Sequence, residues 1–195
     1  GMFSINDYPE FNRRSVIEHE FRGYTADDFV GKEGLTKKDL NWYWLPEDDV
    51  YTHNKIKGIY LGNFVPWDSY NNTKLIKKKY KWVESDEPFE RTYRKISNLD
   101  DMHENGAHDY LKYIKFGYGR CSDHASKDIR RGYMTREEGI EMVKKYDHVK
   151  PYKDLNRWLS YVNMTEEEFD RQADTFRDPR VWKKINNKWI KKYNL

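Results

Sequence analysis

The chain has 195 residues, of which 37% are hydrophobic and 35% are charged, and its formal net charge is +3. So many charges beside so few apolar residues would indicate disorder, but aromatic residues supply 16% of the chain and predict a fold built around ring-rich clusters. The nearly balanced charge argues against a dedicated nucleic-acid binder, and no apolar run approaches the roughly 18 residues of a membrane span.

The low aliphatic content indicates a core that depends in part on a partner. Cys121 is the only cysteine, which excludes an intrachain disulfide and a zinc site built from cysteines. It also favours a reducing compartment. No basic-then-apolar signal segment opens the chain, so the expected location is cytoplasmic.

The first third of the chain is predicted to form short helices interrupted by glycine. Residues 12–21 are predicted to form the first of these short helices. The pairs Thr25 with Asp28 and Thr36 with Asp39 have the spacing of a capping box and predict two further helix starts, the second of which ends at Pro46.

Residues 58–65 (GIYLGNFV) are rich in β-branched and aromatic residues and predict a strand that ends at Pro66. Since one strand cannot form a sheet, it pairs either with a weaker neighbour such as residues 90–96 or with a sheet of another chain. Asp68 is then predicted to cap a helix that runs to about Tyr80.

The chain is predicted to be helical from residue 108 onward. A helix over residues 108–116 ends at Gly117 and Gly119, and Ser122 is predicted to cap a second helix that Gly132 ends. The remaining helix starts are predicted from a capping residue and its partner: Thr135 with Glu138, Thr165 with Glu168, and Asp178 with Pro179.

Two stretches of the chain are basic and contain no acid. Residues 74–81 hold five lysines, and residues 180–192 hold six basic residues. Each is most simply interpreted as the solvated face of a helix.

The turn at residues 117–120 is the first candidate site. It brings Arg120 next to the predicted helix start at Ser122, with His124 in the first turn, and free N–H groups there suit a phosphate or a carboxylate. The alternative is an ordinary helical hairpin whose arginine pairs with Asp123 or Asp128.

Other sites are weaker or excluded. Trp67 and Asp68 follow the predicted strand, where ligands of α/β sheets commonly bind, although Asp68 could merely cap the helix and Trp67 could be core. No pair of histidines or acids has the spacing of a metal site on one helix face, no nucleophile elbow is present, and no glycine loop is built to hold nucleotide phosphates.

Three consecutive strings, HDYLKYIKFGYGR, SDHASKDIRRG and MTREEGIEMVKKYD, together with the upstream IYLGNFVPWDSY, resemble the C-terminal region of the N-acetyl sugar amidotransferases of the WbpG and PseA type. The resemblance covers about residues 58–147. It implies lipopolysaccharide or nonulosonic acid biosynthesis and a PP-loop nucleotide fold. It also implies an ATP-dependent reaction in which ammonia from a glutaminase converts an acetamido sugar into an acetamidino sugar.

The sequence departs from that family in lacking its cysteine-bearing segment and its Ser-Gly-Gly-x-Asp-Ser loop. We therefore expect a truncated piece or the product of a split gene, with no cofactor of its own. The expected partners are a nucleotide-activated N-acetyl sugar, a glutaminase subunit and a separate ATP-binding subunit, without a membrane and without nucleic acid. The rivals are a non-catalytic module that docks such subunits and a nucleic-acid-binding helical domain.

These observations predict an α+β chain, mainly α-helical, with a small sheet near the middle. Residues 2–100 are expected to complete an α/β domain, and residues 101–195 to form a helical domain. By hypothesis, the basic side chains hold a sugar nucleotide's diphosphate and the acids and Trp67 hold its sugar. The candidate substrate-binding residues are Trp67, Asp68, Lys115, Arg120, Asp123, His124 and Arg130.

Overall fold

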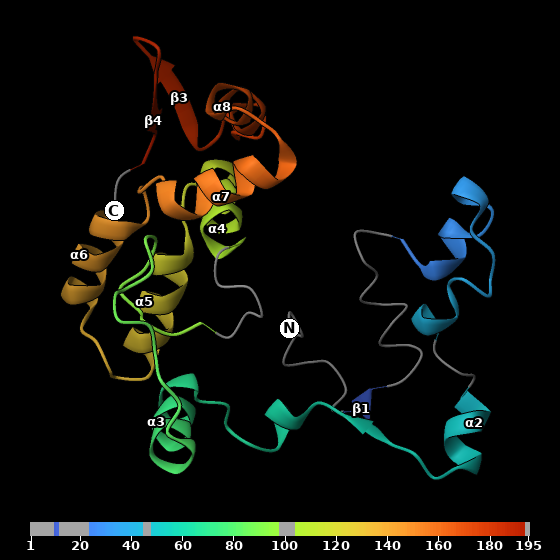
Figure 1. The fold of residues 1–195 in the computed structure, drawn as a ribbon. Coiled ribbons are helices and arrows are strands. Elements are labelled where there is room, and N and C mark those ends of the chain that lie inside the picture. The colour runs from blue at the N-terminus through green and yellow to red at the C-terminus, as the bar shows by residue number, and fades with distance from the viewer. Residues whose placement is uncertain (1–9, 12–23, 45–47, 98–103, 194–195) are drawn as a thin grey trace. The chain divides into compact units, whose positions relative to one another are not determined.

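The computed structural model describes residues 10–11, 24–44, 48–97 and 104–193. The chain divides into two compact units, Gly1–Lys81 and Trp82–Leu195 (Figure 1). The loop that follows residue 81 packs on the helices of the second unit through Glu90, Arg91 and Thr92.

The first unit consists of short elements. Two-residue strands, β1 (Glu10–Phe11) and β2 (Gly58–Ile59), pair antiparallel. The other elements are η1 (Ala26–Phe29), η2 (Lys32–Gly34), η3 (Asn41–Tyr43), α2 (Asp48–His53), η4 (Leu61–Asn63) and α3 (Ser69–Tyr80).

The strand predicted over residues 58–65 is wrong beyond Ile59, because residues 61–63 turn into η4. Its partner is β1, and residues 90–96 form turns and bends instead of a strand. The helix predicted over residues 12–21 lies outside the described residues, as does Pro46.

Two of the three predicted caps of this unit are confirmed. Thr36 and Asp39 are joined by hydrogen bonds, but residues 37–40 form a turn and not a helix. Thr25 and Asp28 form a capping box, although it starts only a 3-10 helix. Asp68 caps α3 through the N–H groups of Tyr70 and Asn71, at 2.9 and 3.3 Å. Local hydrogen bonds therefore fix where these turns begin.

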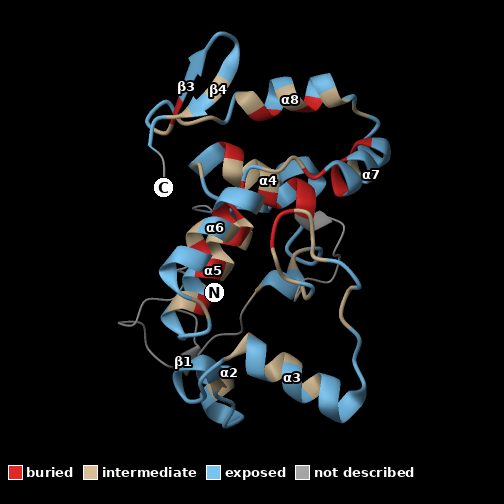
Figure 2. Ribbon diagram, turned by 90° about the vertical axis from the view of Figure 1, so that its left-hand side faces the viewer, coloured by how far each residue is buried: buried red, intermediate tan, exposed pale blue. Residues whose placement is uncertain are grey.

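None of the first unit's residues whose burial is described is buried, and Figure 2 shows its elements in the exposed and intermediate colours. Large apolar side chains stand in solvent, among them Trp42 at 91% and Trp67 at 66% exposure. This agrees with the expectation that the chain's own core is incomplete.

The second unit holds five helices and a hairpin among its described residues. They are α4 (Glu104–Phe116), α5 (Arg120–Arg130), α6 (Arg136–Tyr146), α7 (Tyr152–Val162), α8 (Glu166–Asp174), β3 (Trp182–Ile185) and β4 (Lys188–Lys191). The mainly α-helical class with a small sheet is thus confirmed. No helix in the described part of the chain is both long and apolar enough to span a bilayer.

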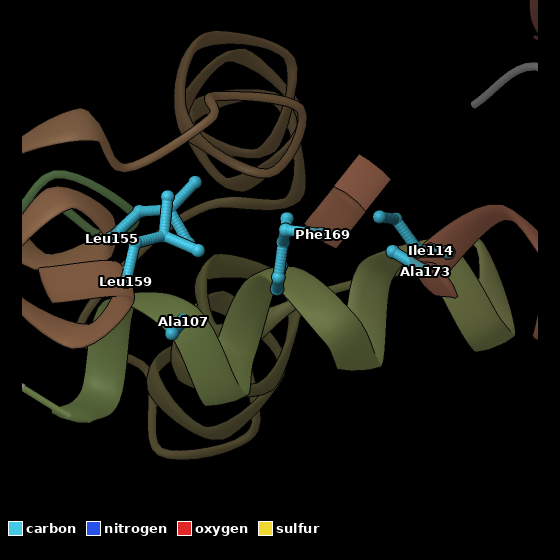
Figure 3. Close-up of a cluster of buried hydrophobic side chains, with 6 residues drawn as sticks. All are labelled: Ala107, Ile114, Leu155, Leu159, Phe169 and Ala173. Atoms are coloured by element: carbon cyan, nitrogen blue, oxygen red, sulfur yellow. The ribbon is translucent and has the colours of Figure 1, made fainter. Parts of the chain in front are cut away.

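Two apolar clusters hold the helices together. In the larger one, side chains of α4, α7 and α8 meet, and Figure 3 shows Leu155, Leu159 and Phe169 lying against the α4 ribbon that carries Ala107 and Ile114. In the smaller one, Cys121 and Ala125 of α5 pack on Val143 of α6. Burial raises the pKa of the Cys121 thiol to about 12, so this cysteine is an apolar core residue.

The capping boxes predicted at Thr135 with Glu138 and at Thr165 with Glu168 are confirmed as the starts of α6 and α8. Ser122, in contrast, is not a cap. The cap of α5 is Gly119, and Ser122 lies inside the first turn of the helix.

The helix predicted after Asp178 and Pro179 is wrong, because residues 182–191 form the β3–β4 hairpin. Its two-residue turn is Asn186-Asn187, with φ of 47° and 62°. Asparagine tolerates positive φ at both central positions of such a turn, which matches the twist of the two strands. Asp178 instead accepts hydrogen bonds from Arg180.

Gly117 joins the hairpin to the helices. Its φ is +76°, and a Cβ at this position would lie 2.5 Å from Cγ1 of Val181. Gly132 has a similar φ of +73°, but a Cβ there would meet nothing within 4 Å. Both positions therefore require a positive φ, but only Gly117 is closely packed against another side chain.

We expect Gly132→Ala to lower the free energy of unfolding by about 1–2 kcal/mol, the cost of its positive φ. Gly117→Ala should lower it further, because the added Cβ also clashes with Val181. The excess should shrink in the double variant Gly117→Ala/Val181→Ala, because the clash is then relieved. Urea unfolding of the unsubstituted chain and of these three variants measures the free energies. Equal effects of the two alanine substitutions would show that the hairpin does not pack on this turn.

Candidate functional site

A tight turn of six residues, residues 89–94 (FERTYR), organises the second unit, and we call it the anchor segment. Its ends are joined by backbone hydrogen bonds from Phe89 N to Arg94 O and from Thr92 N to Phe89 O, both 3.1 Å. The side chains of this closed turn reach different parts of the second unit: Glu90 reaches the start of α7, whereas Thr92 and Arg94 both reach α5.

Arg91 is the buried member of this segment, with 2% exposure. Its guanidinium donates to the backbone carbonyls of Asp147, at 2.5 Å, and of Val149. It also lies 5.2 and 5.5 Å from the ring centroids of Tyr110 and Tyr113 on α4. Burial lowers the pKa of Arg91, and the negative charge of Asp147 opposes that shift.

Asp147, the residue after α6, fills the N-terminus of α5. Its carboxylate accepts hydrogen bonds from Gly119 N at 2.8 Å, from Ser122 N at 3.2 Å and from the Ser122 hydroxyl at 2.5 Å. The helix start that the sequence offers to an anion is thus occupied by a carboxylate of the same chain.

Glu90 does the same for α7. Its carboxylate accepts hydrogen bonds from Lys153 N, at 3.1 and 3.2 Å, and from Asp154 N at 3.3 Å. The second unit therefore ties two helix starts together through its own acids, Asp147 and Glu90.

A small, partly open cleft lies beside the anchor segment. Its lining comes from residues 89–92, from residues 96–97, and from α4, α5 and α7. The lining residues are Phe89, Glu90, Arg91, Thr92, Ile96, Ser97, Gly106, Asp109, Arg120, His124 and Asp154.

Arg120 and Asp109 form the central ion pair of the cleft. The guanidinium binds the carboxylate in a bidentate manner, with Nε to Oδ2 at 3.0 Å and Nη2 to Oδ1 at 2.8 Å. The Asp109 side chain is 4% exposed and that of Arg120 is 28% exposed. One edge of the guanidinium is therefore engaged within the protein, while part of Arg120 reaches solvent.

His124 lies one turn further along α5, and its Nδ1 is 2.7 Å from the Thr92 hydroxyl. Burial lowers the pKa of His124 to about 3, and the nearby Arg94 and Arg120 lower it as well. The imidazole is thus neutral at physiological pH and can form a hydrogen bond without carrying charge.

The lining of the cleft carries three carboxylates, Glu90, Asp109 and Asp154, and two guanidiniums, Arg91 and Arg120. With His124 neutral, the formal sum is −1. Such a lining does not attract a diphosphate or triphosphate, but its hydroxyl, imidazole and carboxylate groups suit the hydroxyl and amide groups of an uncharged polar ligand.

Of the predicted substrate-binding residues, the structure brings Arg120 and His124 together in this cleft. Asp123, on the same helix, instead pairs with Lys112. Lys115 is exposed, and its amino group lies 5.2 Å from the Phe116 ring centroid.

Arg130 is also exposed and donates to the Ser126 hydroxyl at 2.6 Å. It lies ten residues beyond Arg120, about 15 Å along α5. The predicted cluster of Lys115, Arg120 and Arg130 around a diphosphate is therefore not assembled.

Trp67 and Asp68 belong to the first unit. Trp67 is exposed, and Asp68 caps α3, which is the role that sequence reasoning gave as the alternative. Within the described residues, no group of three or more histidines, cysteines and acids is placed to bind a metal ion.

Sequence reasoning missed nine of the eleven lining residues of the cleft, among them Glu90, Thr92, Asp109 and Asp154. The run FERTYR offered a signal, because five polar or charged residues follow one another there without the period of a helix or strand. Such a run is typical of a segment whose side chains each find a separate partner.

A family model described as "LPS biosynthesis protein WbpG-like, C-terminal domain" matches residues 79–194. The match covers the whole second unit up to its last residue but one. No curated protein matches the chain.

Replacing Arg120 with alanine should lower the free energy of unfolding by about 3–5 kcal/mol, because it leaves the buried Asp109 carboxylate without its cation. The double variant Asp109→Asn/Arg120→Gln should recover most of that loss. Urea unfolding measures both, with Arg180→Ala, which breaks an exposed pair with Asp178, as the control of little effect. A cost for Arg120→Ala as small as the control's would contradict a buried ion pair.

His124 should make the fold less stable in mild acid. The unfolded state binds a proton below its pKa of about 6.5, but the folded state does so only below about 3, so stability falls as the pH drops below 6.5. Between pH 7 and pH 5 we expect a loss of about 2 kcal/mol from this residue. His124→Gln, which keeps a partner for Thr92, should remove that part of the pH dependence. Unfolding curves of both proteins with the same slope against pH would contradict a neutral His124.

Proposed function

This chain belongs to the family of WbpG-like C-terminal domains of lipopolysaccharide biosynthesis proteins, and we propose that it serves as the C-terminal part of an ATP-dependent N-acetyl sugar amidotransferase. In that reaction an acetamido group of a sugar becomes an acetamidino group. The assignment to this reaction rests on the motifs of residues 58–147 together with the cleft of the second unit.

The observation that carries the proposal is the cleft's mixture of polar groups. The Thr92 hydroxyl, the neutral His124 and the part of Arg120 that reaches solvent line one cleft with three carboxylates. Sugar hydroxyls and an N-acetyl group are recognised by such neutral and charge-assisted hydrogen bonds, and Phe89 offers an apolar contact for a ring face. We assign this cleft to the sugar portion of a nucleotide-activated N-acetyl sugar.

The cleft does not fit ATP. Its formal charge of −1 would repel a triphosphate, and the N–H groups at the starts of α5 and α7 are engaged by Asp147 and Glu90. The proposal therefore places ATP on a separate ATP-binding partner and takes ammonia from a glutaminase. The residues of this chain orient the sugar.

A second function, docking of those partner subunits, is favoured by the first unit. Among the described residues of this unit, Trp42, Tyr43 and Trp67 are 91%, 74% and 66% exposed. Large exposed aromatic side chains are typical of protein interfaces. This docking role complements the sugar-binding role of the second unit.

Calorimetric titration of the 195-residue chain tests the cleft. We expect a UDP-N-acetyl sugar and the free N-acetyl sugar to bind, and ATP not to bind. Ile96→Trp should weaken sugar binding at least about tenfold, because the indole fills the cleft without removing a hydrogen-bonding side chain. Val162→Trp, at an exposed position of α7 outside the cleft, is the matched control.

Three results would each overturn a part of the proposal. Equal affinity of Ile96→Trp and Val162→Trp for the sugar would show that the sugar does not bind in this cleft. Binding of UDP with the same affinity as the UDP-sugar would show that the nucleotide is what is recognised. Binding of ATP alone would contradict its assignment to a partner.

A further inference from the structure

The β3–β4 hairpin presents one free face whose composition follows from its register. Lys183 lies opposite Ile190, and Ile185 lies opposite Lys188. Because side chains alternate across a strand, these four residues share one face of the hairpin. Ile185 and Ile190 are each 43% exposed, and Figure 2 shows most of the hairpin in the exposed colour.

The opposite face of the hairpin is already in contact with the helical unit. Trp182 is 4% exposed and packs edge-on against Tyr113, with ring centroids 5.4 Å apart. Trp189 donates to Asp174 at the end of α8 at 2.7 Å. Since these contacts hold the inner face, the face of Lys183, Ile185, Lys188 and Ile190 is fixed outward.

The charge on this part of the chain has one sign. Residues 180–192 hold six basic residues and no acid, and the turn at the tip is the uncharged Asn186-Asn187. Lys183 and Lys188 thus lie together with Ile185 and Ile190 on one exposed surface, which we call the hairpin face.

Three kinds of anionic partner could meet such a surface. A protein partner is disfavoured because protein interfaces are poor in lysine, and both cations of the hairpin face, Lys183 and Lys188, are lysines. A nucleic acid is disfavoured because bases stack on aromatic rings, whereas Trp182 and Trp189 lie on the inner face. An anionic lipid surface accepts both components, since lysine ammonium groups bind headgroups while isoleucines enter the interfacial region.

We propose that the hairpin face docks this chain peripherally onto an anionic lipid surface. The inference is independent of the sugar-binding proposal, and it differs from the expectation from sequence that no membrane is involved. The contact is reversible and sensitive to salt, because it rests on two lysines and two isoleucines.

Co-sedimentation of the 195-residue chain with vesicles tests this. We expect binding to vesicles of equal parts phosphatidylcholine and phosphatidylglycerol, little binding to pure phosphatidylcholine, and release at high salt. Lys183→Gln/Lys188→Gln should weaken binding about tenfold or more, and Ile185→Ser/Ile190→Ser should also weaken it several-fold.

The matched control is Lys77→Gln/Lys78→Gln, which removes the same charge from the lysine-rich helix α3. It should leave vesicle binding within about twofold of the unsubstituted chain, a change far smaller than that expected of the hairpin lysines. Equal loss in the two lysine variants would overturn the proposal, because binding would then follow net charge. The proposal would also be overturned if the lysine substitutions weakened vesicle binding and the isoleucine substitutions did not. The hairpin face would then recognise negative charge alone, as in an acidic polymer.

A fluorescent label gives a second measurement. Cys121 is fully buried, so Ile185→Cys provides the accessible thiol for an environment-sensitive dye. A blue shift of the dye on adding the anionic vesicles is expected. Vesicle binding without any shift would show that another surface makes the contact.

Discussion

The second unit depends on how two buried charges, the Arg91 guanidinium and the Asp147 carboxylate, are satisfied. Isolated in an apolar interior, each would cost several kcal/mol. Arg91 binds the two carbonyls that follow α6, while Asp147 receives the N–H groups of α5. Both converge on Gly119, where a Cβ would lie 2.8 Å from Arg91 Nη2 and 3.0 Å from Asp147 Oδ1. Glycine is therefore required here because of close approach, and the ordinary φ of this residue shows that conformational freedom is not the reason.

This arrangement also sets the position of the cleft. Once Arg91 is fixed, the neighbouring residues of the anchor segment have little freedom, so Glu90 reaches the start of α7 and Thr92 reaches His124. Tyr93 and Arg94 then both bind Asp128 on α5. The cleft is thus formed by a non-helical segment held by charge-assisted hydrogen bonds to helices. Substitutions at Arg91 or Asp147 would be expected to disturb ligand binding without touching the ligand.

How far the sequence predicts this structure follows from the range of each interaction. The boxes at Thr135 and Thr165 and the cap at Asp68 join residues two or three apart, so their spacing alone reveals them. Asp147 lies 28 residues from Gly119 and Glu90 lies 64 residues from Asp154, and no local pattern connects such pairs. The hairpin is not predicted, because Asp178-Pro179 matches a helix start, whereas the positive φ of Asn186 and Asn187 is a property of the folded chain. Of the site, Arg120 and His124 were predicted from the turn beside them, whereas Asp109 and Thr92 join it only through tertiary contacts.

The use of the chain's own acids at helix starts restricts what the second unit can recognise. A helix N-terminus binds phosphate because its N–H groups are unpaired, but those of α5 and α7 are engaged by Asp147 and Glu90. Recognition in the cleft must then come from side chains, and there the acids outnumber the cations. The two basic stretches without acids lie elsewhere, on α3 and on the hairpin. A net-acidic cleft for an uncharged polar ligand and a separate basic surface for an anionic partner are two consequences of one distribution of charge.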